Sequence, residues 1–550
     1  MKTKNKTLFA VLFLITAMIS CDTDRLPETA IADASYWKSE SDLKMAANYL
    51  YTSLPNVSIS ADLMSDDSFG TASNSISDGS RNVPATDGNY NNNYGFIRAA
   101  NKLIENAPKV LANGVAATNV NWYVGEAKYF RARAYYNLLQ RYGGVPLILK
   151  VLDENSPELQ APQNTRDEVV NAIYADLDDA VSKLRTASVL SSTTYASYGR
   201  ISQTAALSLK AEVALFEGTR SKFHGYGDPI KHLTIARNAA KAVMDSKEHS
   251  LFNTASGGNT AYFNLLQYAG EGSGNKENIL VNQYGKSVAD VVVSHNTIAE
   301  IDNGRYGQTQ SLVDAYLMKD GLPYTKSPLY VAPNATTTKA KDLYTNRDPR
   351  MSDRFFKTGD PYNIGVAFSV PNSFMVSKYA YRGYFNDVDR AAGRSFIDYP
   401  ITRYAEILLI YAEASFELNG TISDADLDLS INLLRARAAM PKLTNAFVTA
   451  NGLDMRTEIR RERRVELSLE GFRYWDLIRW KTAEIELPKT VLGSYWYAEF
   501  GKAPATLDSN SYIILQANTK RKFDPARDYL WPFPTNELGL NPNLKQNPNW

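Results

Sequence analysis

A polar stretch at positions 58–93 contains the residues best suited to hold a small polar ligand. It is rich in Ser, Asn, Asp and Gly, lacks helical spacing, and is longer than most loops in compact domains. A tyrosine ring can cover the flat face of a sugar, while amide, carboxylate and guanidinium groups pair with adjacent hydroxyls. We predict one wall of a ligand site from Asp66, Asp67, Arg81, Asn89, Tyr90, Asn91 and Tyr94. The alternative is a solvated loop whose side chains cap their own backbone.

A second group of similar chemistry lies more than 200 residues further along the chain. These residues combine an amide, a guanidinium and an aromatic ring shortly before a turn at 320–323. We predict the facing wall of the site from Asn303, Arg305, Tyr306 and Gln308. Both walls are predicted from composition and position alone.

Metal chemistry has little support. The chain has one cysteine, and no two of its four histidines stand at ligand spacing. Asp66, Asp67 and Asp78 crowd one loop, so oxygen ligands for calcium remain possible, although EF-hand spacing is missing. We predict no metal and no cofactor, and leave a structural calcium ion open.

Catalysis is harder to judge. A glycosidase needs two suitably spaced carboxylates, which a sequence cannot place in space. The chain contains no serine elbow, phosphate loop or dinucleotide glycine motif in the right context. A surface hydrolase therefore stays an alternative without a positive signal.

A cationic run at 460–464 suggests an anion-binding patch at first sight. Four glutamates at 458, 462, 466 and 470 share this segment at helical spacing, so we expect ion pairs instead. The neighbouring run 473–476, Arg-Tyr-Trp-Asp, contains groups that could bind a sugar, but we expect it to pack inside the frame.

The N-terminus has the pattern of a secretory signal peptide. Three lysines precede an apolar stretch of about a dozen residues, which is too short to span a membrane that requires roughly 20. Cys21 follows directly, and as the single cysteine it has no internal disulfide partner. Met18-Ile19-Ser20-Cys21 resembles a bacterial lipobox, with Met18 in place of the usual leucine. We predict a signal peptide at 1–20 and a tether at 21–38 that is lipidated on Cys21.

Bulk composition narrows the class of protein. Hydrophobic residues make up 44% of the 550 residues, enough to bury a large core. The formal net charge of +1 gives no global field for nucleic acid, so we predict no nucleic-acid partner.

The pattern of apolar residues predicts a mostly α fold. Helical periodicity occurs at 42–54, 94–111, 122–142, 166–184, 199–218 and 229–245, and returns at 401–418, 424–438 and 457–480. Small and large residues four apart, as in Ala132 and Tyr136, resemble tetratricopeptide repeats. Between them, 250–399 has short Val- and Tyr-rich runs broken by Gly, Pro and Asn. We expect N-terminal helical repeats at 39–249, an irregular insertion lobe at 250–399, and C-terminal helical repeats and coil at 400–550.

Several separate motifs together resemble the SusD/RagB family of nutrient-binding lipoproteins, and they extend over nearly the whole mature chain. The most specific is IRRERRVELSLEGFRYWDLIRW at 459–480. The others are SYWKSESDLKMAANYLYTSL at 35–54, EAKYFRARAYYNLLQRYGGVPL at 126–147, GRISQTAALSLKAEVALFEGT at 199–219, NRDPR at 346–350, RYAEILLIYAEASFELNG at 403–420 and LWPFPTNELGLNPNLKQNPNW at 530–550.

The resemblance implies four tetratricopeptide-like helix pairs that support an irregular lobe with the ligand site. It implies a lipid-anchored protein on the cell-surface side of the outer membrane, without catalytic residues. It also implies a partner, a SusC-like TonB-dependent outer-membrane transporter, to which most members deliver an oligosaccharide and some a peptide. A protein-only scaffold is a further alternative.

Overall fold

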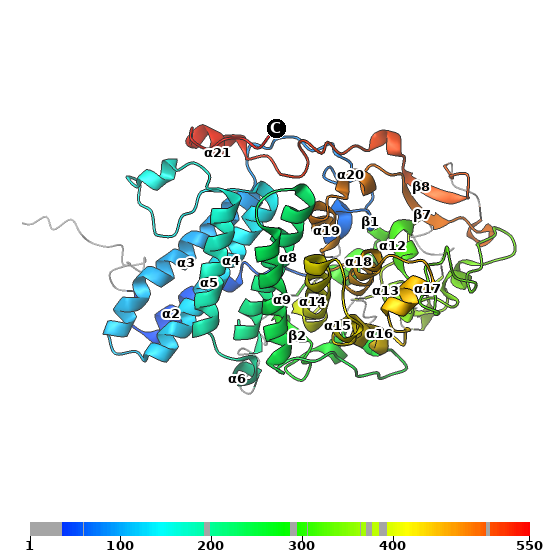
Figure 1. Ribbon diagram of the computed structural model, residues 1–550, viewed down its shortest axis with the longest axis horizontal. Helices are drawn as coiled ribbons and strands as arrows, with labels where there is room; N and C mark the ends of the chain where they lie inside the picture. Colours follow the sequence, from blue (N-terminus) through cyan, green and yellow to red (C-terminus); the bar gives the residue numbers. More distant parts are fainter. Residues whose placement is uncertain are drawn as a thin grey trace, which may run out of the picture.

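The protein is described here by a computed structural model (Figure 1). The structure describes residues 36–58, 60–191, 198–285, 294–304, 306–363, 365–369, 377–383, 393–501 and 506–550. The predicted signal peptide 1–20, most of the predicted tether 21–38 including Cys21, and Arg305 lie outside these residues. Within the described part of the chain, we find no helix that combines the length and the apolar character needed to cross a membrane.

The N-terminal half is a layer of long helices that lie side by side in Figure 1, and apart from the short α6 each packs against the next along the chain. Their bounds are α2 Glu40–Tyr51, α3 Gly88–Ala112, α4 Ala117–Tyr142, α5 Arg166–Lys183, α6 Ala187–Ser191, α8 Gln203–His224 and α9 Pro229–Asp245. Local sequence signals account for several helix starts. Thr165 and Glu168 form a capping box at α5, and α9 has Pro229 in its first turn.

Several helix boundaries differ from the predicted ones, and the difference at α3 affects the predicted ligand site. Helix α3 begins at Gly88, six residues before the predicted start at 94, because the Asp87 carboxylate accepts a hydrogen bond from the Asn89 backbone N–H at 2.8 Å. The polar positions 89–93 are therefore the first turns of a helix and not part of a loop.

The middle of the chain is irregular and contains most of the short antiparallel strands, although β1 precedes it and β7 and β8 follow it. They pair two by two as β1 with β3, β2 with β6, β4 with β5, and β7 with β8. The strands are β1 Ser68–Phe69, β2 Asn278–Asn282, β3 Gly307–Gln308, β4 Pro361–Asn363, β5 Val366–Ala367, β6 Tyr399–Arg403, β7 Val491–Tyr495 and β8 Tyr512–Gln516. Short helices between them are α10 Ala261–Asn264, α11 Thr297–Asp302, α12 Gln310–Ala315 and α13 Pro349–Arg354.

Helices return in the last third. Their bounds are α14 Tyr404–Asn419, α15 Asp424–Asp428, α16 Ile431–Arg437, α17 Asn445–Ala450, α18 Met455–Glu466, α19 Arg473–Arg479, α20 Ala483–Glu486 and α21 Thr535–Leu540. Single turns of 3-10 helix occur at Ala61–Met64, Pro157–Gln160, Tyr268–Gly270, Ala340–Tyr344, Ala498–Phe500 and Asn518–Lys520.

Two predicted helices are each broken in two. The predicted helix 457–480 is interrupted between α18 and α19, where Leu469 and Gly471 have positive φ values of 66° and 83°. A residue in the left-handed region ends a right-handed helix, and glycine adopts this conformation without strain. The predicted helix 424–438 is divided between α15 and α16, where Ser430 leaves the helical conformation.

Buried ion pairs hold the helical frame to the irregular lobe. Arg403 of β6 donates to Glu277 at 2.6 Å and to Glu470 at 2.7 Å, while Arg350 of α13 donates to Glu462 at 2.7 Å. The ion pairs expected for the cationic run are present, including Arg463 with Asp476 at 3.0 Å. The prediction of a mostly α, tetratricopeptide-like scaffold with an irregular, strand-containing insertion is confirmed.

Candidate functional site

One face of the first half of α3 forms the base of a cavity. Tyr90, Tyr94 and Arg98 stand four residues apart, so the helix presents them on one side. Tyr90 is buried, with its ring 4.9 Å from that of Tyr94 and 5.4 Å from that of Tyr142. The cap at Asp87 is held in turn by the Tyr142 hydroxyl, which donates to its carboxylate at 2.5 Å.

The segment that follows α4 forms a second wall. The Tyr94 hydroxyl donates to the Pro146 carbonyl at 2.8 Å, and Arg98 donates to the Leu152 carbonyl at 2.6 Å. Asn101 is buried in α3 and donates to the carbonyls of Ile148 and Lys150 at 3.0 and 2.9 Å. This stretch has almost no regular structure, so these side chains supply the partners that its carbonyls need.

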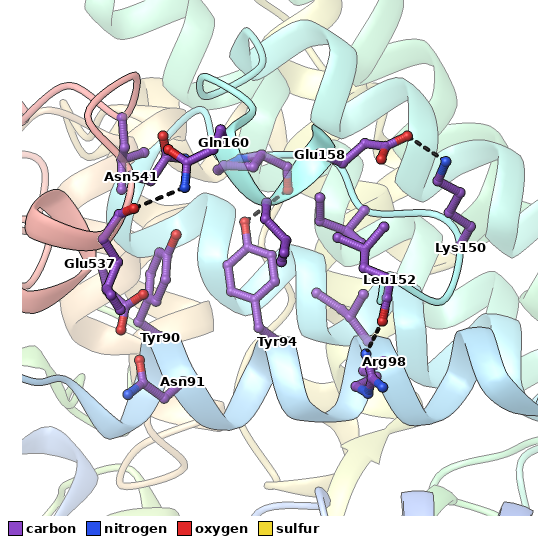
Figure 2. Close-up of a pocket in the computed structure, with 16 residues that line it drawn as sticks. Tyr90, Asn91, Tyr94, Arg98, Lys150, Leu152, Glu158, Gln160, Glu537 and Asn541 are labelled. Carbon is purple, nitrogen blue, oxygen red and sulfur yellow. Dashed lines mark hydrogen bonds and ion pairs between the residues drawn. The ribbon is translucent and has the colours of Figure 1, made fainter. Parts of the chain in front are cut away.

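The C-terminal segment forms the third wall. The Gln160 side chain donates to the Leu540 carbonyl at 3.0 Å, and Asn541 donates to the Ala161 carbonyl at 2.7 Å. Figure 2 shows Glu537 and Asn541 of this segment beside Tyr90 and Gln160 at one end of the cavity.

The three walls enclose an open cavity of about 560 Å³. Its size lies within the range of roughly 300–1,000 Å³ that is typical of ligand pockets. The lining residues are Tyr90, Asn91, Tyr94, Ile97, Arg98, Pro146, Ile148, Lys150, Leu152, Glu158, Leu159, Gln160, Glu537, Leu540, Asn541 and Leu544.

The lining combines an apolar floor with hydrogen-bonding groups of each kind. Asn91, Gln160 and Asn541 provide amides, and Lys150 pairs with Glu158 at 2.5 Å at one end. Burial raises the pKa of the Glu537 carboxyl, and no basic side chain of the described residues forms an ion pair with it. Burial also raises the pKa of Tyr94, so its phenol stays neutral. Such a site suits a neutral ligand that has apolar faces and many hydroxyls.

Three of the predicted site residues, Tyr90, Asn91 and Tyr94, line this cavity. Asn89 is exposed in the same turn of α3 but faces away and donates to Asp87 at 3.1 Å. Arg81 lies over the rings of Trp531 and Trp550, with its guanidinium carbon 5.0 and 4.7 Å from their centroids. It thereby holds the C-terminal segment without lining the cavity.

Asp66 and Asp67 are buried elsewhere. Arg464 and Arg473 form ion pairs with them, which occupies these carboxylates within the frame. Asp78 accepts from the Ser80 backbone N–H at 2.9 Å instead of joining them. Across the described ranges, no group of three or more His, Cys, Asp or Glu side chains is placed to hold a metal ion.

The predicted facing wall also lies outside the cavity. Gln308 is buried in β3 opposite Ser68 of β1, so the two predicted segments do meet, but at this short strand pair. Tyr306 packs on the core of the irregular lobe, and Asn303 is exposed at the end of α11. Arg305 lies outside the described residues.

Most of the cavity's lining was missed by the sequence analysis. Arg98 had a usable signal, because it follows Tyr90 and Tyr94 at helical spacing. The residues of 146–160 and of the C-terminal segment had none, since their contact with α3 depends on tertiary packing.

The comparisons with known proteins agree on one family. A family model described as the SusD family matches residues 266–550, and another, described as starch-binding associating with outer membrane, matches residues 28–215. SusD-like protein P2 of Formosa agariphila is 26% identical over 576 residues, covering 99% of each chain.

Solved structures share the fold. A SusD-like carbohydrate binding protein from Bacteroides fragilis aligns with a TM-score of 0.74 and 22% identity, over 93% of this chain and 100% of that one. A further solved structure, whose description names a xylogluco-oligosaccharide, aligns with a TM-score of 0.62 and 20% identity, over 91% of this chain and 97% of that one. Because the family model matches more than half of the chain, the protein belongs to the SusD family.

Proposed function

We propose that this protein is a lipoprotein of the outer cell surface that binds an oligosaccharide in the cavity over α3 and delivers it to a TonB-dependent transporter. The observation that carries the binding step is the tyrosine and amide lining of this cavity. A sugar ring has apolar faces edged by hydroxyls, so it can lie on Tyr94 while its hydroxyls reach Asn91, Gln160 and Asn541. Members of the SusD family with solved structures include a carbohydrate binding protein, which supports this ligand class.

The lining contains two carboxylates, Glu158 paired with Lys150 and Glu537, whose pKa burial raises. Glycosidases also use two carboxylates with unequal pKa values, so hydrolysis is tested directly. Binding without turnover is the simplest function for a wall built mainly from apolar side chains and amides. Release of reducing sugars from a polymer by the purified protein would instead favour the surface-hydrolase alternative.

Anchoring and delivery rest on different observations. Cys21 follows a signal-peptide pattern at the position where bacterial lipoproteins are acylated. A diacyl anchor holds a water-soluble body on a membrane at about 0.8 kcal/mol per buried CH₂, so the protein needs no spanning helix. Family membership supports a TonB-dependent barrel as the partner that receives the ligand.

The binding step is tested by isothermal titration of the purified protein against panels of neutral oligosaccharides and of peptides. We expect one class of oligosaccharide to bind and Tyr94→Leu to weaken its binding by about 1 kcal/mol or more, roughly fivefold in Kd. Asn89→Ala is the matched control, because Asn89 lies in the same turns of α3 outside the cavity. If only peptides bind, the ligand is a peptide and not an oligosaccharide, and the proposed delivery role is unaffected.

Delivery is tested by purifying the full-length lipidated protein from outer membranes and identifying what accompanies it. We expect a TonB-dependent barrel to co-purify, and the Cys21→Ala protein to be lost from the membrane fraction. If no barrel appears and Cys21→Ala stays in the membrane fraction, both the anchor and the delivery role are wrong.

A further inference from the structure

A second hollow lies away from the cavity over α3, among α12, α18, α19 and α20. Its volume is about 420 Å³. Figure 1 shows these four helices close together in the C-terminal half of the molecule. Its lining is dominated by arginines and comprises Ser311, Asp314, Ala315, Thr457, Arg460, Arg461, Arg464, Arg473, Trp480, Thr482 and Glu486.

Two of these arginines are fixed from behind by carboxylates. Arg473 donates through Nε and Nη2 to Asp66 at 2.8 and 3.0 Å. Arg464 donates through Nε to Asp67 at 2.9 Å and through Nη2 to Ser311 at 2.8 Å. Each guanidinium plane is therefore held in one orientation, and its remaining terminal nitrogen, Nη1, makes no hydrogen bond within the described part of the chain.

The guanidinium of Arg461 is also held by hydrogen bonds that leave one terminal nitrogen without a described partner, but its own partners are different. Its Nε donates to Glu458 and its Nη1 to the Ala315 carbonyl, at 3.3 and 3.4 Å. Its Nη2 makes no hydrogen bond to any described residue.

Arg460 is held by aromatic rings more than by a carboxylate. Its guanidinium carbon lies 4.4 Å from the ring centroid of Trp480 and 4.8 Å from that of Phe223. The ion pair with Glu417 is long, at 4.0 Å, and Nε and Nη2 have no hydrogen-bond partner among the described residues. Burial lowers the pKa of Arg460 to about 10, which indicates a cation short of compensation.

The two acids in the lining have partners of their own. Glu486 pairs with Lys489 at 2.6 Å, and Asp314 accepts from the Gln310 amide at 2.7 Å. Burial raises the pKa of the Asp314 carboxyl. Arg461, Arg464 and Arg473 thus each keep one terminal nitrogen without a hydrogen bond to a described residue, and Arg460 has none at Nε or Nη2. All four line the hollow, against two carboxylates that are already engaged.

We propose that this hollow binds an oxyanion borne by a sugar, either the carboxylate of a uronic acid or a sulfate ester. Carboxylate and sulfate oxygens accept from guanidinium N–H groups in a planar, directional geometry, and arginines that are already oriented lose little freedom on binding. Anion binding at this hollow does not depend on the cavity over α3. Only the inference that the anion is attached to a sugar rests on the proposed function.

The test is titration of the purified full chain with sodium sulfate, against sodium chloride at equal ionic strength, and with glucuronic acid against glucose. We expect saturable binding of sulfate or glucuronate and none of glucose or chloride at this site. Binding of glucuronate alone would assign the carboxylate, and binding of sulfate alone would assign the sulfate ester. Binding of neither anion would overturn the proposal.

Variants locate the site. We expect Arg460→Gln with Arg461→Gln to weaken anion binding at least tenfold. Arg456→Gln is the control, because Arg456 lies on the same helix, pairs with Glu417 and does not line the hollow. It removes one positive charge, as each of the two replacements in the double variant does. Equal affinity in the double variant and the control would overturn the proposal, provided both melt as the wild type does. Tyr94→Leu must leave anion binding unchanged, so a failure of the cavity over α3 is distinguished from a failure of this hollow.

Discussion

Arg473 binds Asp66 through two parallel hydrogen bonds, Nε to Oδ1 at 2.8 Å and Nη2 to Oδ2 at 3.0 Å. The two residues are 407 positions apart in the chain. Arg464 joins the same carboxylate at 3.0 Å, so one N-terminal turn is tied to both α18 and α19. Although burial alone would raise the pKa of Asp66, the charges of Arg464 and Arg473 lower it well below its usual range.

Removing the Asp66 carboxylate takes away both short hydrogen bonds of Arg473, which then keeps only a contact of 3.8 Å to Asp67, while Arg464 still pairs with Asp67. We expect Asp66→Asn to lower the free energy of unfolding by about 3–5 kcal/mol, the usual cost of breaking a buried ion pair from one side. Urea denaturation at pH 7 measures this. Asp178→Asn is the control, because Asp178 is 61% exposed in its pair with Lys210 and its loss should change stability by less than about 0.5 kcal/mol. Equal losses of stability in Asp66→Asn and Asp178→Asn would contradict a special role of the buried ion pairs of Asp66.

Asp62 gives a pH dependence of the opposite sign to that of a paired acid. Burial and the neighbouring Asp67 raise the pKa of Asp62 to about 8. The folded protein then keeps a proton that the unfolded chain releases near pH 4, so stability falls as pH rises from about 4 to about 8, by at most about 1.4 kcal/mol per pH unit. We expect Asp62→Asn, which mimics the protonated acid, to be more stable than the wild type at pH 8 and equal to it near pH 4. The measurement is the unfolding free energy of both proteins at a series of pH values. A difference between them that stays constant with pH would contradict the raised pKa of Asp62.

Glu466 makes the folded protein less stable as pH falls, as is usual for a carboxylate paired with arginines. Burial alone would raise its pKa, but Arg437, Arg403 and Arg350 lower the pKa of Glu466 to about 2. Its contribution to stability is complete above the unfolded value of about 4.5 and is lost as pH falls from there towards 2. We expect Glu466→Gln to be destabilised by about 3–5 kcal/mol at pH 7. The difference in unfolding free energy between Glu466→Gln and the wild type should narrow below pH 4.5. A difference that does not depend on pH would argue against the lowered pKa of Glu466.

Gly144 controls the second wall of the cavity over α3. A methyl group at this position would lie 2.1 Å from the Asn164 carbonyl oxygen, so the segments 144–148 and 161–165 would have to separate. We expect Gly144→Ala to cost about 1–3 kcal/mol in stability and to weaken oligosaccharide binding, because Pro146 and Ile148 would shift. Gly95→Ala on α3 is the control, since nothing lies within 4 Å of its added methyl group. It should raise stability by about 0.5–1 kcal/mol and leave binding unchanged.

The long helices were predictable because their apolar residues recur at the spacing of one buried face, and α9 was predicted to the residue. The break between α18 and α19 was not, because Leu469 takes a left-handed conformation that its residue type disfavours and that packing imposes. The cavity was partly predictable. Tyr90, Asn91 and Tyr94 have suitable chemistry, but their true partners lie on segments whose approach no local pattern indicates.

The walls of the cavity over α3 come from parts of the chain that are synthesised at different times. Gln160 and Leu540 join its second and third walls, and they are separated by 380 residues. Synthesis from the N-terminus makes the first two walls long before the third. The cavity is therefore complete only once the last segment has been made and has packed over α3, so a chain that ends before α21 lacks its third wall.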